Sequence, residues 1–148
     1  MIDVSVIIVN WNTRQLLRDC IDSVLRYHDG YQVEIVVVDN HSSDDSVAMV
    51  REDYPRVLLI ANDENSGFAR ANNQGARAAS GRYVLLLNSD AMLTAGALRS
   101  LVSLADANPK IGMVGAQLIN PDGSFQASFT RIPTLGQEAL ILSGMGRL

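Results

Sequence analysis

Four short apolar runs alternate with segments of helical periodicity in the first 107 residues of the chain. The apolar runs cover residues 4–9, 33–38, 57–60 and 83–87. Each run is almost continuously apolar, which is the pattern of a strand whose two faces are both covered. The helical patterns extend over residues 13–30, 42–53, 68–79 and 94–107. This alternation predicts an α/β fold: a mostly parallel sheet with right-handed crossovers and helices on both faces.

The regular alternation fades towards the C-terminus. A fifth strand is expected over 111–116, and residues 120–148 show mixed patterning with one helical stretch at 135–142. A chain of 148 residues fits a single domain. We therefore expect one domain over 1–148, in which residues 1–119 form the alternating core.

Composition narrows the class of protein. The one cysteine, Cys20, excludes an internal disulfide framework, and with only two histidines a zinc site is disfavoured. The net charge of −4 argues against nucleic-acid binding. No apolar run reaches the roughly 18 residues of a membrane span, and no signal peptide is evident at the N-terminus. We therefore expect a cytoplasmic protein.

Polar residues stand at the carboxyl end of each of the four strands. They are Asn10 and Asn12, then Asp39, then residues 62–67, and finally Asn88-Ser89-Asp90. The carboxyl ends of parallel strands share one edge of the sheet, and ligands of open α/β folds bind there. Polar residues are also common after strands for a structural reason, because they form turns and helix caps. Packing gives little reason for a carboxylate directly after a buried strand, so Asp39 and Asp90 favour a ligand site.

The common phosphate-binding motifs are absent from this edge. A dinucleotide fold needs G-x-G-x-x-G after the first strand, and residues 10–14 contain no glycine. A P-loop needs G-x-x-x-x-G-K-[ST], and the one lysine of the chain, Lys110, lies far from it. A receiver domain needs paired acids where Asn10 stands. Oxygen ligands such as Asp90 instead suit a hard divalent cation that keeps positions for substrate phosphates.

Four ordered motifs resemble glycosyltransferase family 2. They are residues 4–12, residues 37–44, the Asn65-Ser66-Gly67-Phe68-Ala69 segment with Asn73 and Gly75, and Leu86-Leu87-Asn88-Ser89-Asp90. The turn at Pro121-Asp122-Gly123-Ser124 is similar to that of rhamnosyltransferase-like bacterial members of the family. The resemblance covers nearly the whole chain. It implies the Rossmann-like GT-A fold, which binds nucleotide-diphospho-sugars.

The resemblance also implies a set of donor-binding residues. By position they are Val9, Asn10, Asn12, Asp39, Asn65, Gly67, Asn72, Asn88 and Asp90. Asp39 would bond the base or ribose, and Asp90 would bind the Mg²⁺ or Mn²⁺ that bridges the diphosphate. Two positions depart from the family pattern: Asn88 replaces the first acid of the D-x-D motif, and Asn72 stands where many relatives have arginine. Arg70 is the candidate that would neutralise the phosphates instead.

The resemblance places the catalytic base in an acceptor-binding half, well downstream of the D-x-D motif. Only three acids follow Asp90 here, namely Asp106, Asp122 and Glu138. None lies in a segment similar to the acceptor motif, so the catalytic base is unassigned. We therefore expect the chain to be the N-terminal, donor-binding portion of a longer enzyme, with residues 120–148 as the truncated start of the acceptor side.

The implied reaction is metal-dependent, inverting transfer of a sugar from a UDP- or dTDP-sugar to a hydroxyl of a glycan or glycolipid, as in polysaccharide biosynthesis. Expected partners include the inner face of the cytoplasmic membrane and, through apolar surface at 124–148, a second copy of the chain. Two other functions stay open. One is a non-catalytic nucleotide-sugar-binding module. The other is a nucleotidyltransferase, which would need a glycine-rich basic loop that the sequence lacks.

Three side chains near these motifs have structural roles as alternatives to functional ones. Cys20 is expected to lie in the core, because it occupies an apolar helical face. His41 is expected in a solvated loop and not as a ligand. Trp11 is expected to pack at the sheet edge, with stacking on a base as the less favoured alternative.

Overall fold

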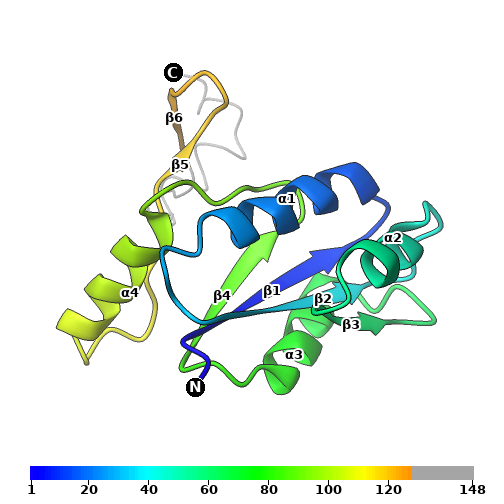
Figure 1. The fold of residues 1–148 in the computed structure, drawn as a ribbon, viewed down its shortest axis with the longest axis horizontal. Coiled ribbons are helices and arrows are strands. Elements are labelled where there is room, and N and C mark those ends of the chain that lie inside the picture. Colours follow the sequence, from blue (N-terminus) through cyan, green and yellow to red (C-terminus); the bar gives the residue numbers. More distant parts are fainter. Residues whose placement is uncertain (128–148) are drawn as a thin grey trace, which may run out of the picture. The chain divides into compact units, whose positions relative to one another are not determined.

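The sheet of the computed structural model contains four parallel strands, and a helix follows each of them (Figure 1). The structure describes residues 1–127. The strands are β1 Val4–Asn10, β2 Val33–Asp39, β3 Leu58–Ala61 and β4 Tyr83–Asn88. The helices are α1 Arg14–Arg26, α2 Ser46–Asp53, α3 Phe68–Ala78 and α4 Ala97–Ala107. The predicted alternation and the mostly parallel α/β sheet are therefore confirmed.

The spatial order of the strands is β3-β2-β1-β4, so the direction in which the sheet grows reverses beside β1. The register pairs Asn10 with Asp39 and Val9 with Asn88. The carboxyl ends of β1, β2 and β4 are therefore level with one another. In open parallel sheets the crevice outside such a reversal point is where ligands bind.

Both faces of the two central strands are buried. Val6 and Ile8 of β1 pack in a cluster with α1, α2 and α4, whereas Ile7 and Val36 pack in a second cluster with α3. A Cβ atom at Gly75 of α3 would lie 2.4 Å from Cγ2 of Ile7, so this glycine allows the close approach of α3 to the sheet. Helices on both faces explain why β1 and β2 are apolar at successive positions.

Two helices begin later than their sequence patterns predict. α2 begins at Ser46, because Asp45 before it has a φ of 62° and ends the preceding loop. α4 begins at Ala97 and not near Thr94. Asp29, in the loop before β2, accepts hydrogen bonds from two backbone N–H groups at the start of α4, each at 3.0 Å. This cap comes from a residue at least 67 positions away, so local sequence does not reveal it.

The expected strand over 111–116 is wrong. The structure has no strand in this segment. Gly112 and Gly115 interrupt the apolar run, and the side chain of Met113 is 90% exposed. The segment therefore lacks the packing that a strand needs.

The chain divides into two compact units, Met1–Val114 and a second unit that begins at Gly115. The second unit contains a hairpin of two short strands, β5 Leu118–Ile119 and β6 Phe125–Gln126. The expected boundary near residue 119 stays a prediction, and the expected helix over 135–142 lies outside the described residues. Among residues 1–127, no helix is long and apolar enough to cross a membrane.

Candidate functional site

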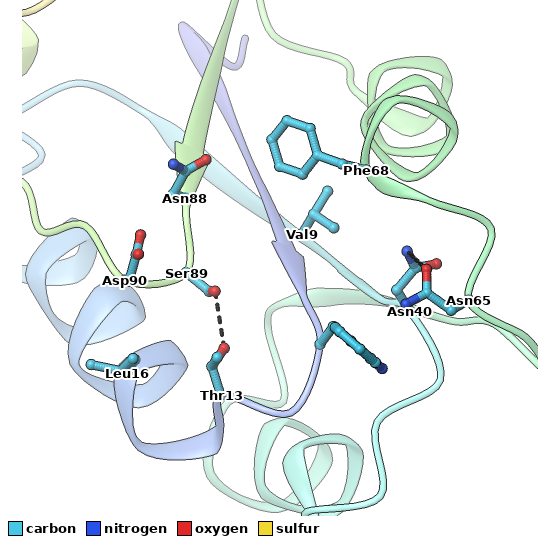
Figure 2. A pocket seen from close by; sticks show the side chains of 10 residues that line it. Val9, Thr13, Leu16, Asn40, Asn65, Phe68, Asn88, Ser89 and Asp90 are labelled. Atoms are coloured by element: carbon cyan, nitrogen blue, oxygen red, sulfur yellow. Dashed lines mark hydrogen bonds between the residues drawn. The ribbon is translucent and has the colours of Figure 1, made fainter. Parts of the chain in front are cut away.

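An open pocket lies at the carboxyl edge of the sheet, between the ends of β1 and β4 (Figure 2). Its volume is about 370 Å³, within the usual size range of small-molecule sites. The residues that line it are Val9, Trp11, Thr13, Leu16, Asn40, Asn65, Phe68, Asn88, Ser89 and Asp90. They lie at or after the carboxyl ends of the four strands, or at the start of α1 and α3, so the parallel topology brings distant segments into one site.

The polar side chains of the pocket gather at two opposite ends. Figure 2 shows Asn88 and Asp90 on one side and Asn40 and Asn65 on the other, with Val9 between them. Asp90 is the one carboxylate of the lining, and it is exposed. The pocket therefore has an anionic end and a neutral amide end.

Thr13 ties the loop after β4 to the end of β1. Its Oγ1 lies 2.7 Å from Asn10 Oδ1 and 2.9 Å from Ser89 Oγ, the second contact drawn in Figure 2. An amide oxygen can only accept, so the Thr13 hydroxyl donates to Asn10 and accepts from Ser89. This link holds the backbone next to Asp90 beside the start of α1.

Asp39 lies behind the pocket and is 2% exposed. Its Oδ1 accepts a hydrogen bond from Asn10 Nδ2 at 2.7 Å, and its Oδ2 accepts one from the N–H of Ser42 at 2.8 Å. Asn10 Nδ2 also donates to Ser42 Oγ at 3.0 Å. A buried carboxylate is tolerated when donors surround it in this way. Asp39 therefore joins the end of β1 to the loop after β2.

A second set of hydrogen bonds joins the loops after β1 and β2. Asn12, with a φ of 54°, accepts the N–H of Ser43 at Oδ1 at 2.7 Å, and Asp44 accepts the N–H of Arg14 at 2.8 Å. Burial alone would raise the pKa of Asp44. Hydrogen bonds from Ser46 and Arg14 outweigh burial and hold that pKa below its ordinary value. The two loops thus form one hydrogen-bonded wall next to the pocket.

Comparison with known proteins decides the family. The chain matches the model of glycosyl transferase family 2 over residues 5–143. It belongs to glycosyltransferase family 2. The succinoglycan biosynthesis protein ExoO of Rhizobium meliloti (strain 1021) is 34% identical in an alignment 150 positions long, which covers 97% of this chain and 43% of that protein. A GalNAc(5)-diNAcBac-PP-undecaprenol beta-1,3-glucosyltransferase of Campylobacter jejuni is 32% identical over 85% of this chain and 41% of that protein. The chain spans less than half the length of these relatives.

Two solved structures share the fold. The TarS protein of S. aureus in complex with UDP-GlcNAc aligns with a TM-score of 0.62 and 23% identity over 73% of this chain and 32% of that chain. The mannosyltransferase PcManGT of Pyrobaculum calidifontis, in complex with GDP-Man and Mn²⁺, aligns with a TM-score of 0.63 and 28% identity. The alignment covers 80% of this chain and 36% of that chain. The GT-A fold that the sequence motifs implied is therefore confirmed.

The residues that the motifs singled out for donor binding fall into four groups. Four of them line the pocket at the carboxyl edge of the sheet, namely Val9, Asn65, Asn88 and Asp90. Asn10, Asn12 and Asp39 instead hold the surrounding loops together. Gly67 stands just before α3 with a φ of 83°, a conformation that side-chain-bearing residues rarely adopt. Their contacts with a nucleotide sugar stay a prediction.

Asn72 forms the fourth group and lies apart from the pocket. It is 9% exposed, and its Nδ2 donates to the carbonyl oxygen of Phe68 at 3.0 Å. It lines a second, largely apolar groove of about 500 Å³, whose other residues come from β1, α3, β4, α4 and residues 111–114. Arg70 is exposed and does not line the pocket. The assignment of Asn72 to nucleotide binding stays a prediction that its position does not support.

Several residues that line the pocket have no role predicted from the sequence, and the structure differs from the prediction made for Trp11. Packing of Trp11 at the sheet edge is wrong, because 57% of its surface is exposed and it lines the pocket. Phe68 is 59% exposed and lines the same pocket (Figure 2). These two aromatic side chains offer faces on which a planar ring can stack. No periodic apolar pattern in the sequence distinguishes either of these two residues from an aromatic residue that packs in the core.

The pocket contains one carboxylate, at Asp90, that could share a divalent cation with a bound ligand. Among the residues that the structure describes, no three His, Cys, Asp or Glu side chains lie close enough to hold a metal ion by themselves. Mg²⁺ and Mn²⁺ commonly bind through one or two carboxylates and the phosphates of a substrate. One carboxylate at Asp90, beside the oxygens of Asn88 and Ser89, fits that mode of binding.

Cys20 and His41 take the structural roles expected of them. Cys20 is fully buried in the cluster below α1, and burial raises the pKa of its thiol to about 12, with a further contribution from the charge of Asp90. The thiol therefore stays protonated at neutral pH and supplies no thiolate ligand. His41 is exposed in the loop after β2.

Proposed function

We propose that the pocket holds the nucleoside diphosphate of a nucleotide sugar, and that the chain is the donor-binding portion of a glycosyltransferase. One observation carries this proposal: Asp90, three amides and two exposed aromatic side chains line the same pocket. A diphosphate with its cation suits the anionic end, and a planar base suits the amide end. The complexes of TarS with UDP-GlcNAc and of PcManGT with GDP-Man and Mn²⁺ support this choice of ligand.

Asp90 is the residue that would hold Mg²⁺ or Mn²⁺, together with the phosphates of the ligand. The donor set consists of hard oxygen atoms, which these ions prefer. When bound, such a cation neutralises the charge on the departing diphosphate. The chain's own contribution is to place the carboxylate, since the link from Thr13 to Ser89 fixes the backbone next to it.

The proposed reaction is inverting transfer of a hexosyl or rhamnosyl group from a UDP- or dTDP-sugar to a hydroxyl of a glycan or glycolipid. The name of the relative in succinoglycan biosynthesis supports a polysaccharide as the product. Action in the cytoplasm at the inner face of the membrane, and pairing of two chains, belong to the same proposal.

The general base is not assigned to any described residue. Asp106 accepts hydrogen bonds from Arg82 and Tyr83, and these bonds lower its pKa. Hydrogen bonds from Ser124 lower the pKa of Asp122 in the same way. A general base works best with a pKa near the working pH, so neither acid suits the task. Glu138 lies outside the described residues.

A second candidate function is a nucleotide-sugar-binding module without transfer activity. It is favoured because Asp106 and Asp122 both accept hydrogen bonds that make them unsuited to act as the general base. Release of UDP from a UDP-sugar separates the two candidates. Release that increases when a hydroxyl acceptor is added supports the transferase. Donor binding without such release supports the binding module.

Calorimetric titration with UDP, dTDP and GDP, with and without Mn²⁺, tests donor binding itself. We expect UDP or dTDP to bind and Mn²⁺ to strengthen the binding, because Asp90 and the phosphates together complete the cation site. A folded chain that binds none of the three nucleotides in either condition contradicts the proposal.

A further inference from the structure

Asn40 is a buried amide at the carboxyl end of β2, and its side chain contacts the loop between β3 and α3. Three percent of its surface is exposed. Its Oδ1 accepts hydrogen bonds from Asn62 Nδ2 at 3.1 Å, from the N–H of Ser66 at 3.1 Å and from Ser66 Oγ at 3.2 Å. Its Nδ2 donates to Asn65 Oδ1 at 2.8 Å. Both polar atoms of the Asn40 side chain therefore have partners in this loop.

Two backbone donors fix which way the amides of Asn40 and Asn65 face. An N–H group can only donate, so the Asn40 atom that meets the N–H of Ser66 is the oxygen, and the nitrogen then faces Asn65. The N–H of Gly67 lies 3.0 Å from Asn65 Oδ1, so this atom of Asn65 is also an oxygen. Asn65 Oδ1 thus accepts from Gly67 and from Asn40, and neither amide can turn over without losing a hydrogen bond.

The remaining polar atom of the Asn65 side chain is Nδ2, a donor. Within residues 1–127 it has no acceptor, since both hydrogen bonds of the side chain end on Oδ1. Asn65 is exposed and lines the pocket. The amide end of the pocket therefore presents a hydrogen-bond donor of fixed orientation.

We propose that Asn65 Nδ2 donates to the carbonyl oxygen at position 4 of a uracil or thymine base, and that Asn40 is the positioning residue that fixes this donor. This inference rests on the proposed function. Asp90 is assigned to the diphosphate, which leaves the base at the opposite end, beside Asn40 and Asn65 (Figure 2). In a pyrimidine nucleotide, position 4 lies across the ring from the nitrogen that carries the ribose. The oxygen at that position therefore points away from the phosphates.

A donor of fixed orientation discriminates between pyrimidines. Uracil and thymine have a carbonyl oxygen at position 4, whereas cytosine has an amino group, which is itself a donor. A site built to bond one group rejects an analogue that leaves its polar atoms unpaired. One such hydrogen bond predicts a preference for UDP over CDP of about tenfold.

Calorimetric affinities for UDP and CDP, each with Mn²⁺, test this with two isosteric variants. Asn65→Asp replaces the donor by an acceptor, while its other oxygen still accepts from Asn40 and Gly67, so the UDP preference should be lost. Asn40→Asp keeps the shape of residue 40 but sets an oxygen against Asn65 Oδ1. Asn65 then turns its Nδ2 away from the pocket, and the preference should fall by about tenfold here too.

Gln74→Glu is the matched control, because Gln74 belongs to the same amide network without lining the pocket. It exchanges two hydrogen bonds of 2.9 Å with Asn62, and Asn62 in turn donates to Asn40. The substitution makes the same change from amide to carboxylate. The ratio of UDP to CDP affinity should stay at the wild-type value.

The outcomes separate this inference from the proposed function. If the wild-type chain binds UDP and both variants keep its UDP-to-CDP ratio, the role of the two amides is overturned and the proposed function stands. If Asn40→Asp weakens UDP and CDP equally, Asn40 only supports the loop and its positioning role is overturned. If the folded wild-type chain binds neither nucleotide, both proposals fall. Asn65 is exposed, so Asn65→Asp gives the readout even if Asn40→Asp does not fold.

Discussion

Asp90 carries the one carboxylate that lines the pocket, so we expect Asp90→Asn to abolish the effect of Mn²⁺ on UDP affinity. Changes to groups that merely support metal ligands commonly weaken metal binding by about 10–100-fold, and loss of the ligand itself should cost at least as much. The melting temperature should not change, because the side chain is exposed. Asp63→Asn removes the same charge from an exposed residue outside the pocket and is the matched control. Equal Mn²⁺ dependence in wild type and Asp90→Asn would show that Asp90 is not the ligand.

Asp39 acts on the pocket from behind, so its substitution should affect stability and affinity together. Asp39→Ala removes the acceptor of the N–H of Ser42 and one of the two acceptors of the buried Nδ2 of Asn10. We expect a loss of about 1–3 kcal/mol in the free energy of unfolding, measured in urea. UDP affinity should fall by the same factor with and without Mn²⁺. A weakening seen only with Mn²⁺ would instead place Asp39 at the cation.

Trp11 is the one tryptophan of the chain and lines the pocket, so its fluorescence should report binding. We expect UDP with Mn²⁺ to quench the emission as the base excludes water from the indole. Phe68→Ala should weaken UDP binding by about tenfold through loss of a stacking face. Leu104→Ala removes an exposed apolar side chain of α4, outside the pocket, and should have no effect. Saturable UDP binding without any change in emission would exclude contact with Trp11.

Part of this site could be read from the sequence, because Asn88 and Asp90 directly follow an apolar run. Asn40 and Thr13 could not be recognised in the same way. Their roles depend on hydrogen bonds to Asn65 and Ser89, which are 25 and 76 positions away in the chain. Only the folded loops show which amide atom faces the pocket.

At the scale of elements, burial on both faces made β1 and β2 easy to predict, since the packing of helices on each side requires apolar residues at successive positions. The run at 111–116 has a similar apolar content but contains Gly112 and Gly115, and it forms no strand. Helix starts were predicted from nearby residues. The start of α4 depends instead on Asp29, whose carboxylate reaches it from the loop before β2.

The cap at α4 has a pH dependence with a definite sign. The hydrogen bond from the N–H of Arg99 lowers the pKa of Asp29; burial opposes this, and the N–H of Gly96 adds to it. A carboxylate with a lowered folded pKa stabilises the fold above its unfolded pKa, near 4, and this stabilisation is lost as pH falls through the folded pKa. Asp29→Ala should therefore lower the free energy of unfolding by about 1 kcal/mol at pH 7.

Unfolding in urea at pH 7 and at pH 3 checks this prediction. The difference between wild type and Asp29→Ala should shrink at the lower pH. Asp63→Ala, which removes an exposed acid that caps no helix, should show no such change. A difference for Asp29→Ala that is the same at both values would mean that the ionised carboxylate is not what stabilises the cap.

At the scale of the whole molecule, the ten residues that line the pocket all belong to the unit Met1–Val114. The pocket that we propose for the donor therefore lies within this unit, where the strand order reverses beside β1. The alternation of strands and helices predicted a ligand site at that edge, and the pocket lies there. The size of the pocket and its two chemically different ends depend on how four loops pack, which periodicity does not encode.

A crystal structure of the chain with UDP and Mn²⁺, with the anomalous signal of manganese, tests the central claim most directly. We predict a manganese peak at the carboxylate of Asp90 and the uracil ring at the opposite end of the pocket, beside Asn40 and Asn65. A nucleotide bound in the apolar groove that contains Asn72, or a uracil ring at the Asp90 end, would contradict this account.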